Sequence, residues 1–292
     1  MKRSIFGVLL VLTFVAVGIA AAPPLTFTFS DVHANKTATE TDSYAVNVNG
    51  VIAGDYVDSA GVQHGMLLAG TKLTTVNNSS CSANTLAFYG INSANTVVGW
   101  CVSAKTAKDI GFSWAKGKFA GVNFPKGTGT QPTGINDKGE IVGLYFDSAG
   151  VQHGFSKIGT AYKSIDVKGH TSAAAWGVNN TGQITVYAIN SAGTAYDAYL
   201  KTGTTFKLIN DPKAKGTLGT VVHTPNNKGD IDGTYYDSSG NTHGWLLHAG
   251  KYYDVNDTPT LTRADGLNDK LEIVGRYTPS TGGNVGFKAI TH

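Results

Sequence analysis

Three histidines recur at one position in three related segments, and they are the side chains best suited to metal chemistry. His64, His153 and His243 each precede a glycine and each follow an Asp-Ser-x-Gly turn. Three imidazoles held together would form a metal site. Because the segments repeat along the chain, their symmetry spreads the imidazoles around a ring. We therefore expect each histidine to be a hydrogen-bonded brace in its own segment, and we predict no metal and no cofactor.

The acidic residues point to turns rather than to catalysis. Asp230-Ile231-Asp232-Gly233 and the Asp-Ser-x-Gly turns resemble calcium loops, but the closing glutamate of a twelve-residue loop is absent. No Gly-x-Ser-x-Gly, His-Glu-x-x-His or phosphate-binding glycine motif occurs. No carboxylate pair departs from the repeat as a glycosidase dyad would. We therefore predict turn chemistry for the aspartates and assign no catalytic residue.

These residues belong to one repeat of about 45 residues, which the chain carries six times. Its clearest copy is GINDKGEIVGLYFDSAGVQHGF, at 134–155. Each copy contains one marker asparagine at the same position. The markers, spaced by 42 to 47 residues, are Asn47, Asn92, Asn136, Asn179, Asn226 and Asn268. The predicted copies span residues 43–86, 87–131, 132–174, 175–221, 222–263 and 264–292.

Each copy is predicted to form four short strands separated by tight turns. A four-stranded repeat of about 45 residues has the size of one propeller blade. The sixth copy ends after its third strand, whereas residues 25–32 form an extra strand before the first copy. An open solenoid is the alternative, but the complementary ends favour a closed ring. The fold class is therefore all-β, a six-bladed β-propeller over 23–292, closed by an N-terminal strand.

The N-terminal segment and the cysteines indicate export. Lys2 and Arg3 precede an apolar run that ends in small residues, so 1–22 is predicted to be a signal peptide, with an uncleaved anchor as the alternative. We expect no membrane span after cleavage and a secreted or periplasmic location. Cys81 and Cys101 are predicted to form a disulfide, with two buried thiols as the alternative.

Charge disfavours nucleic-acid binding. The formal net charge is +3, and loss of the two basic residues of the signal segment brings it close to neutral. The rest of the chain has no run of lysine or arginine that could follow a phosphate backbone.

The Gly-Ile-Asn, Gly-x-Tyr and His-Gly-Phe elements resemble the HAF-type repeat of bacterial extracellular proteins. The resemblance covers essentially all of the mature chain and implies an exported, propeller-like repeat protein. It implies no reaction and no catalytic residues. Blade four departs most, because Val186 replaces the strand glycine and Tyr196-Asp197-Ala198 replaces His-Gly-Phe.

The candidate ligand site consists of residues that break the repeat where the first strands should converge. Framework positions repeat, but the position before Gly-Ile-Asn varies and is rich in aromatic and polar groups. Aromatic rings there could stack on a sugar, and polar groups could orient it. The alternative is that they only pack between blades. The candidates are Tyr44, Tyr89, Thr133, Trp176, His223 and Asp265, together with the nearby Arg263.

Three functions fit this pattern, because one fold can host many functions. The favoured hypothesis is a monomeric, non-enzymatic binding or scaffold module that recognises a glycan, a peptide or another cell-envelope component at the central mouth. The second is a polysaccharide hydrolase or lyase with His223 and Asp265 near its centre. The third is a purely structural surface protein.

Overall fold

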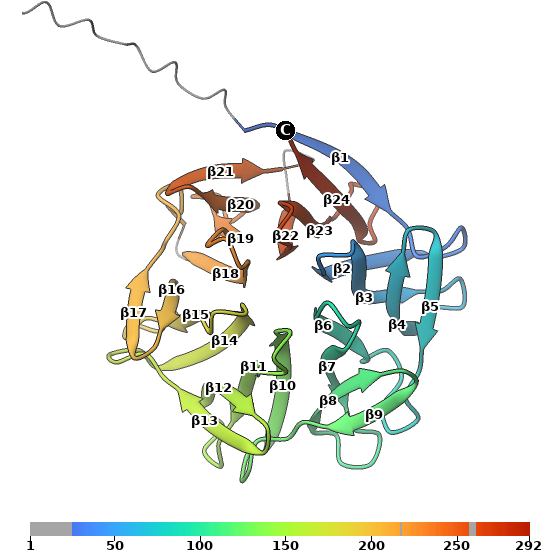
Figure 1. Cartoon of the computed structure of the whole chain (residues 1–292), viewed down its shortest axis with the longest axis horizontal. Coiled ribbons are helices and arrows are strands. Elements are labelled where there is room, and N and C mark those ends of the chain that lie inside the picture. The colour runs from blue at the N-terminus through green and yellow to red at the C-terminus, as the bar shows by residue number, and fades with distance from the viewer. Residues whose placement is uncertain (1–24, 217, 257–260) are drawn as a thin grey trace, which may run out of the picture.

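The computed structural model describes residues 25–292 except 217 and 257–260. The predicted signal segment 1–22 lies outside the described residues. Within them, 24 strands form six four-stranded sheets arranged around one axis (Figure 1). The predicted six-bladed propeller is thereby confirmed. No helix in the described part of the chain is long and apolar enough to cross a membrane.

The blades are numbered in chain order, and each lists its strands from the axis outward. They are β2 (Glu40–Val46), β3 (Val51–Val57), β4 (Gln63–Ala69), β5 (Lys72–Val76) in blade 1; β6 (Ala87–Ile91), β7 (Val97–Val102), β8 (Asp109–Ala115), β9 (Lys118–Gly121) in blade 2; β10 (Gly129–Ile135), β11 (Ile141–Phe146), β12 (Gln152–Ile158), β13 (Ala161–Ile165) in blade 3; β14 (Ser172–Val178), β15 (Ile184–Ile189), β16 (Tyr196–Thr202), β17 (Thr205–Leu208) in blade 4; β18 (Thr220–Pro225), β19 (Ile231–Tyr236), β20 (Thr242–His248), β21 (Lys251–Val255) in blade 5; and β22 (Thr262–Leu267), β23 (Glu272–Tyr277), β24 (Val285–Thr291), β1 (Phe27–Val32) in blade 6.

The N-terminal strand closes the ring. β1 pairs antiparallel with β24, with Phe27 opposite Thr291 and Val32 opposite Gly286. In Figure 1 β1 lies along the outer edge of the last blade, beside the C-terminus. The predicted closing strand is therefore confirmed, and the outer edge of β24 is paired rather than left open.

The second-strand glycines are required by a close approach within each blade. A Cβ on Gly143 would lie 2.3 Å from the main-chain oxygen of Gln131 and 2.8 Å from the ring of Phe155. Because Gly143 has no side chain, the Phe155 ring of the third strand can lie over the second strand, next to the inner strand. The nearest backbone belongs to the same sheet rather than to a stacked neighbour.

The predicted disulfide is present. Cys81, in the connection from β5 to β6, is bonded to Cys101 on β7, and their Cα atoms are 5.6 Å apart. This separation is within the usual range for a disulfide. Cys101 is fully buried in the apolar cluster between blades 1 and 2, so the bond ties the entering loop to the core.

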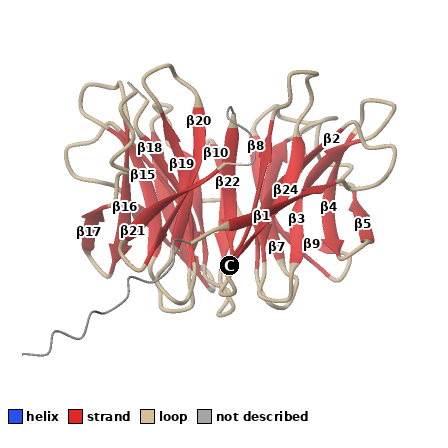
Figure 2. Ribbon diagram, turned by 90° about the horizontal axis from the view of Figure 1, so that it is seen from above, coloured by secondary structure: helices blue, strands red, loops and turns tan. Residues whose placement is uncertain are grey.

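The two edges of the propeller differ. Figure 2 shows short turns along the edge that holds the C-terminus and longer loops along the opposite edge. The inner strands end at the short-turn edge, because β22 runs parallel to β24, the last strand. The six marker asparagines therefore gather around the axis at this edge.

Candidate functional site

Every inner strand is irregular at the position that the sequence singles out. Its pairing with the second strand shifts there, which is the signature of a β-bulge. A bulge leaves a residue unpaired and changes the direction of its side chain. The residues at these shifts are Tyr44, Tyr89, Thr133, Trp176, His223 and Asp265. All six candidates therefore come from equivalent bulges around the axis.

Three of the six bulge residues around the axis are aromatic, and their rings are in contact. The Tyr44 and Tyr89 rings have centroids 4.5 Å apart, and Tyr89 meets Trp176 edge-on at 6.1 Å. Trp176 in turn lies 5.3 Å from the imidazole of His223. Tyr89 of blade 2 reaches Trp176 of blade 4 because blade 3 contributes only the short Thr133. The Thr133 hydroxyl donates to the Ala175 carbonyl at 2.9 Å.

Polar side chains occupy the rest of the space around the axis. His223 Nδ1 lies 3.7 Å from an Asp265 carboxylate oxygen, and the other oxygen accepts a bond from Arg276 at 3.1 Å. The Arg276 guanidinium lies over the Tyr44 ring, 4.7 Å from its centroid. We call Tyr44, Tyr89, Trp176, His223, Asp265 and Arg276 the axial ring.

The charge states within the axial ring follow from burial. Burial lowers the pKa of His223, so the imidazole is neutral, and Nδ1 donates to the Ala264 carbonyl. Burial alone would lower the pKa of Arg276, but Asp265, Tyr44 and Asp42 together raise it, so the guanidinium stays charged. Burial raises the pKa of Tyr44 well above its ordinary value, which keeps this phenol neutral. The ring thus contains one buried ion pair and no exposed acid–base pair.

Arg276, which the sequence interpretation missed, occupies the place considered for Arg263. The Arg263 guanidinium instead donates to the Tyr236 hydroxyl at 3.4 Å. Arg276 directly follows the second-strand glycine, and residues at that position also differ in character between blades. The equivalents are Asp55, Trp100, Leu144, Tyr187 and Thr234. This variation is the signal that could have revealed it.

A cavity of about 110 Å³ opens at the short-turn edge of the axis. Tyr89, Thr133 and Trp176 contribute to its lining, together with the turns that carry the marker asparagines. We call it the central cavity. Tyr44, His223, Asp265 and Arg263 do not line it. The structure therefore brings three of the seven candidates to this cavity, with the rest of the axial ring packed behind them.

The marker asparagines form a closed hydrogen-bonded ring around the cavity. Each side chain donates from Nδ2 to the main-chain carbonyl of the marker in the next blade. The pairs are Asn47 to Asn92, Asn92 to Asn136, Asn136 to Asn179, Asn179 to Asn226, Asn226 to Asn268 and Asn268 to Asn47, at 2.9–3.4 Å. We call this the asparagine ring. It holds the six turns at fixed spacing.

Each marker asparagine also shapes its own turn. The Asn136 side-chain oxygen accepts bonds from the main-chain amides of Lys138 and Glu140, both at 3.0 Å. This is an Asx-type turn. Because both ends of the amide are used, the asparagine links the local turn to the neighbouring blade.

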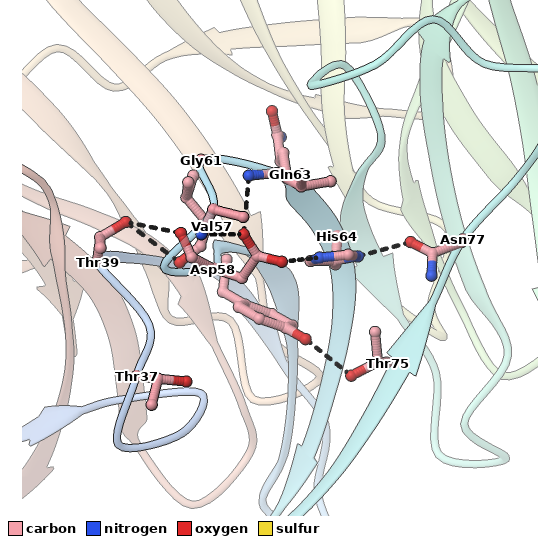
Figure 3. Close-up of polar contacts among 12 residues, drawn as sticks. Thr37, Thr39, Val57, Asp58, Gly61, Gln63, His64, Thr75 and Asn77 are labelled. Carbon is pink, nitrogen blue, oxygen red and sulfur yellow. Dashed lines mark hydrogen bonds and ion pairs between the residues drawn. The ribbon is translucent and has the colours of Figure 1, made fainter.

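The repeated histidines are braces within single blades, as predicted. His64 Nε2 bonds Asp58 at 3.0 Å and Nδ1 bonds Asn77 at 2.7 Å (Figure 3). His153 and His243 bond the equivalent Asp147 and Asp237 in their own blades. The aspartates are the predicted turn residues.

The other oxygen of each of these aspartates closes the Asp-Ser-x-Gly turn. Asp58 Oδ1 accepts from the main-chain amides of Ala60 and Val62, at 2.8 and 2.9 Å. In blade 4, where the histidine is replaced, Asp197 instead bonds His170 at 3.1 Å and Asn210 at 2.8 Å. The brace is thus rebuilt there with different residues.

Comparison with known proteins identifies the fold. No protein-family model and no curated protein matches the sequence. The solved SapL1 lectin in complex with alpha methyl fucoside is 10% identical, with 88% of this chain and 96% of that chain covered at a TM-score of 0.55. The fucose-specific lectin from Aleuria aurantia is 12% identical, with 85% and 91% covered at a TM-score of 0.54. TolB from Acinetobacter baumannii is 12% identical, with 82% and 64% covered at 0.55. At these identities the likeness shows a shared fold alone.

Proposed function

We propose that this chain is an exported glycan-binding module that holds one terminal sugar residue in the central cavity. The observation that carries the proposal is the position of Tyr89 and Trp176 in the lining of a cavity that the asparagine turns and the ends of the inner strands also bound. Aromatic rings offer apolar faces to the C–H groups of a sugar, and amide and carbonyl groups can bond its hydroxyls.

The size of the cavity limits the ligand. Sites that bury drug-sized ligands measure about 300–1,000 Å³, and the central cavity measures about 110 Å³. It suits a single ring or the end of a chain better than an internal stretch of polysaccharide.

The hydrolase alternative receives less support from the same geometry. His223 and Asp265 are only 3% and 4% exposed, and neither lines the central cavity. Arg263 is bonded to Tyr236 instead of to this pair. A general acid–base role requires contact with the reacting group, which these side chains do not offer in this arrangement.

The likeness to two lectins with fucose in their names selects the first ligands to test. Both share the propeller architecture over most of their length with this chain. We therefore rank fucosylated glycans first and other cell-envelope glycans second. Export is part of the proposal and rests on the N-terminal signal pattern and on the resemblance to extracellular HAF-type repeats.

A glycan array probed with the purified mature chain tests this function. The proposal expects retention on glycans that share one terminal sugar, inhibited by that free monosaccharide. Retention on no glycan, or on glycans without a common terminal sugar, would contradict it.

A further inference from the structure

Lysine side chains gather along the outer part of the short-turn edge. Because neighbouring strands are antiparallel, the turn from the third to the fourth strand of a blade lies at this edge (Figure 2). In each of blades 1–5 this turn, taken with two strand residues on either side, carries a lysine and no carboxylate. The lysines are Lys72, Lys116, Lys118, Lys157, Lys201 and Lys251. We call them the lysine rim.

The lysine rim carries positive charge that no carboxylate of its own turns offsets. Four of its lysines are exposed, and Lys157 and Lys201 are half-buried. The Nζ atoms of these two donate to the carbonyls of Gly159 and Gly203, which supplies a hydrogen bond but no opposite charge. No rim lysine forms an ion pair within the part of the chain that the structure describes. These cations are therefore available to an anionic ligand.

The carboxylates of the short-turn edge lie nearer the axis, on the turns from the first to the second strand. Each accepts a hydrogen bond from an asparagine side chain. They are Asp137, Glu140, Asp230, Asp269 and Glu272. The same turns carry the exposed Lys138, Lys228 and Lys270, and Lys288 is paired with Glu272. The inner turns are therefore close to neutral together, and the lysine rim gives this edge its net positive charge.

The opposite edge carries charges of both signs. Its turns from the second to the third strand contain Asp58, Asp147 and Asp237 in blades 1, 3 and 5. The corresponding turn of blade 2 contains Lys105 and Lys108, both exposed. The uniform ring of lysines is thus a property of the short-turn edge, where the central cavity also opens.

The side chains of the lysine rim suit some polyanions better than others. No aromatic side chain in the described chain is exposed, so the rim lacks the stacking platforms that hold single-stranded nucleic acids. The two described arginines, Arg263 and Arg276, belong to the inner and second strands of blade 6, so the rim also lacks the planar donors that read base edges. Lysine ammonium groups act as point charges, which suits carboxylates spaced along a flexible chain.

We propose that the lysine rim binds an acidic polysaccharide, such as a polyuronate, across the short-turn edge. The inference rests on the proposed function only for the choice of a glycan over another polyanion. Attraction between the rim and the carboxylates speeds encounter and fixes which edge of the propeller meets the polysaccharide. A sugar at the end of the same polysaccharide would then lie at the edge where the central cavity opens.

Titration calorimetry of the full mature chain with a galacturonate oligomer tests this surface. The fully methyl-esterified oligomer has the same sugar chain without its charges and should bind at least about tenfold more weakly. Raising NaCl from about 50 to about 300 mM should weaken binding of the charged oligomer at least about tenfold, because salt screens exposed charges.

Charge reversal within one blade provides a matched pair of variants. Lys116→Glu combined with Lys118→Glu changes the lysine rim of blade 2 and should weaken binding at least about tenfold. Lys105→Glu combined with Lys108→Glu makes the same change of net charge at the opposite edge of that blade. It should weaken binding by less than about twofold. Lys72→Glu combined with Lys251→Glu repeats the rim test in two other blades, and melting temperatures confirm that all variants are folded.

Three results would overturn the inference: no binding of the galacturonate oligomer, equal binding of its methyl ester, or equal effects of the rim and control reversals. Oligothymidylate with the same number of charges should bind at least about tenfold more weakly. Equal or tighter binding of that oligonucleotide would identify a nucleic-acid surface and overturn the choice of a polysaccharide. A glycan array that retains no terminal sugar would contradict the proposed function and leave the result at the rim unchanged.

Discussion

The Asn268 side chain donates to the main-chain carbonyl of Asn47 at 2.9 Å and thereby joins the last blade to the first. The two residues are 221 positions apart in the chain. The same bond occurs at each of the other five junctions, so the seam between the chain ends is made like any other junction. The ring is thus closed twice, by β1 at its outer edge and by the asparagine ring at its axis.

Asn136→Ala should destabilise the protein by about 2–4 kcal/mol. The Asn136 amide makes four hydrogen bonds and is 4% exposed, and each net bond contributes about 1 kcal/mol. Chemical denaturation measures the change. Asn49→Ala is the control, because Asn49 is exposed and its side chain donates one bond, to Ser93. Equal losses from the two variants would show that the asparagine ring has no special role.

Val48→Asn should stabilise the protein by about 0.5–1 kcal/mol. At four successive junctions, the main-chain amide of the residue after the marker asparagine donates to a side chain in the next blade. The accepting side chain belongs to the residue at the same position of that blade. The donors are Ser93, Asp137, Asn180 and Asn227, with Asp269 the last acceptor. Val48, which is 36% exposed, offers no acceptor to the Asp269 amide.

The expected readout for Val48→Asn is a higher melting temperature, by about 1–4 °C. Ile158→Asn, at an exposed apolar side chain outside the asparagine ring, is the control and should not raise it. A Val48→Asn protein that melts at or below the temperature of the unaltered chain would contradict the prediction.

The histidine braces should make stability depend on pH in two directions. Burial lowers the pKa of His64, but its bonds to Asp58 and Asn77 outweigh that effect and raise it. The stabilisation from His64 is therefore complete below the ordinary histidine pKa and is lost as pH rises through the higher folded value. The His64 bond and the Val62 amide lower the pKa of Asp58. Its contribution is present above the ordinary aspartate value and is lost as pH falls.

His64→Gln tests this dependence. The brace should contribute most between about pH 4 and 6.5. The difference in melting temperature between the unaltered chain and the variant should be about 1–3 °C at pH 5.5 and smaller at pH 8.5. A difference that is the same at both pH values would mean that the brace acts only as a neutral hydrogen bond.

The parts of the fold that repeat could be predicted, because the same residue type occurs at a framework position in most of the six copies. The period, the four-stranded blades and the closing strand follow from such positions. The Cys81–Cys101 bond does not, because it was predicted from two cysteines in a chain expected to be exported. The bulge residues were found for the opposite reason, since they vary within a constant frame. The cross-blade bonds of the asparagine ring were missed because their acceptors are main-chain carbonyls, and any residue at that position would supply one.

Among the polar members of the axial ring, Arg276 was missed for a geometric reason. Arg263 and Arg276 are opposite each other on neighbouring strands of one blade, and the repeat pattern does not reveal which guanidinium turns toward Asp265. Arg276 does so because it also meets Asp42 and Tyr44 of blade 1. That contact crosses the closure between the chain ends, which is a relationship of the assembled ring and not of the local sequence.

The measurement that bears most directly on the proposed function is the affinity of the Trp176→Ala protein for the terminal sugar selected on the array. An anchor residue contributes about 2 kcal/mol or more, so titration calorimetry should show binding weakened at least about 30-fold, with the variant still folded. Trp114→Ala, on the third strand of blade 2 and outside the cavity lining, should bind the sugar as the unaltered chain does. Unchanged affinity in a folded Trp176→Ala protein would contradict binding at the central cavity.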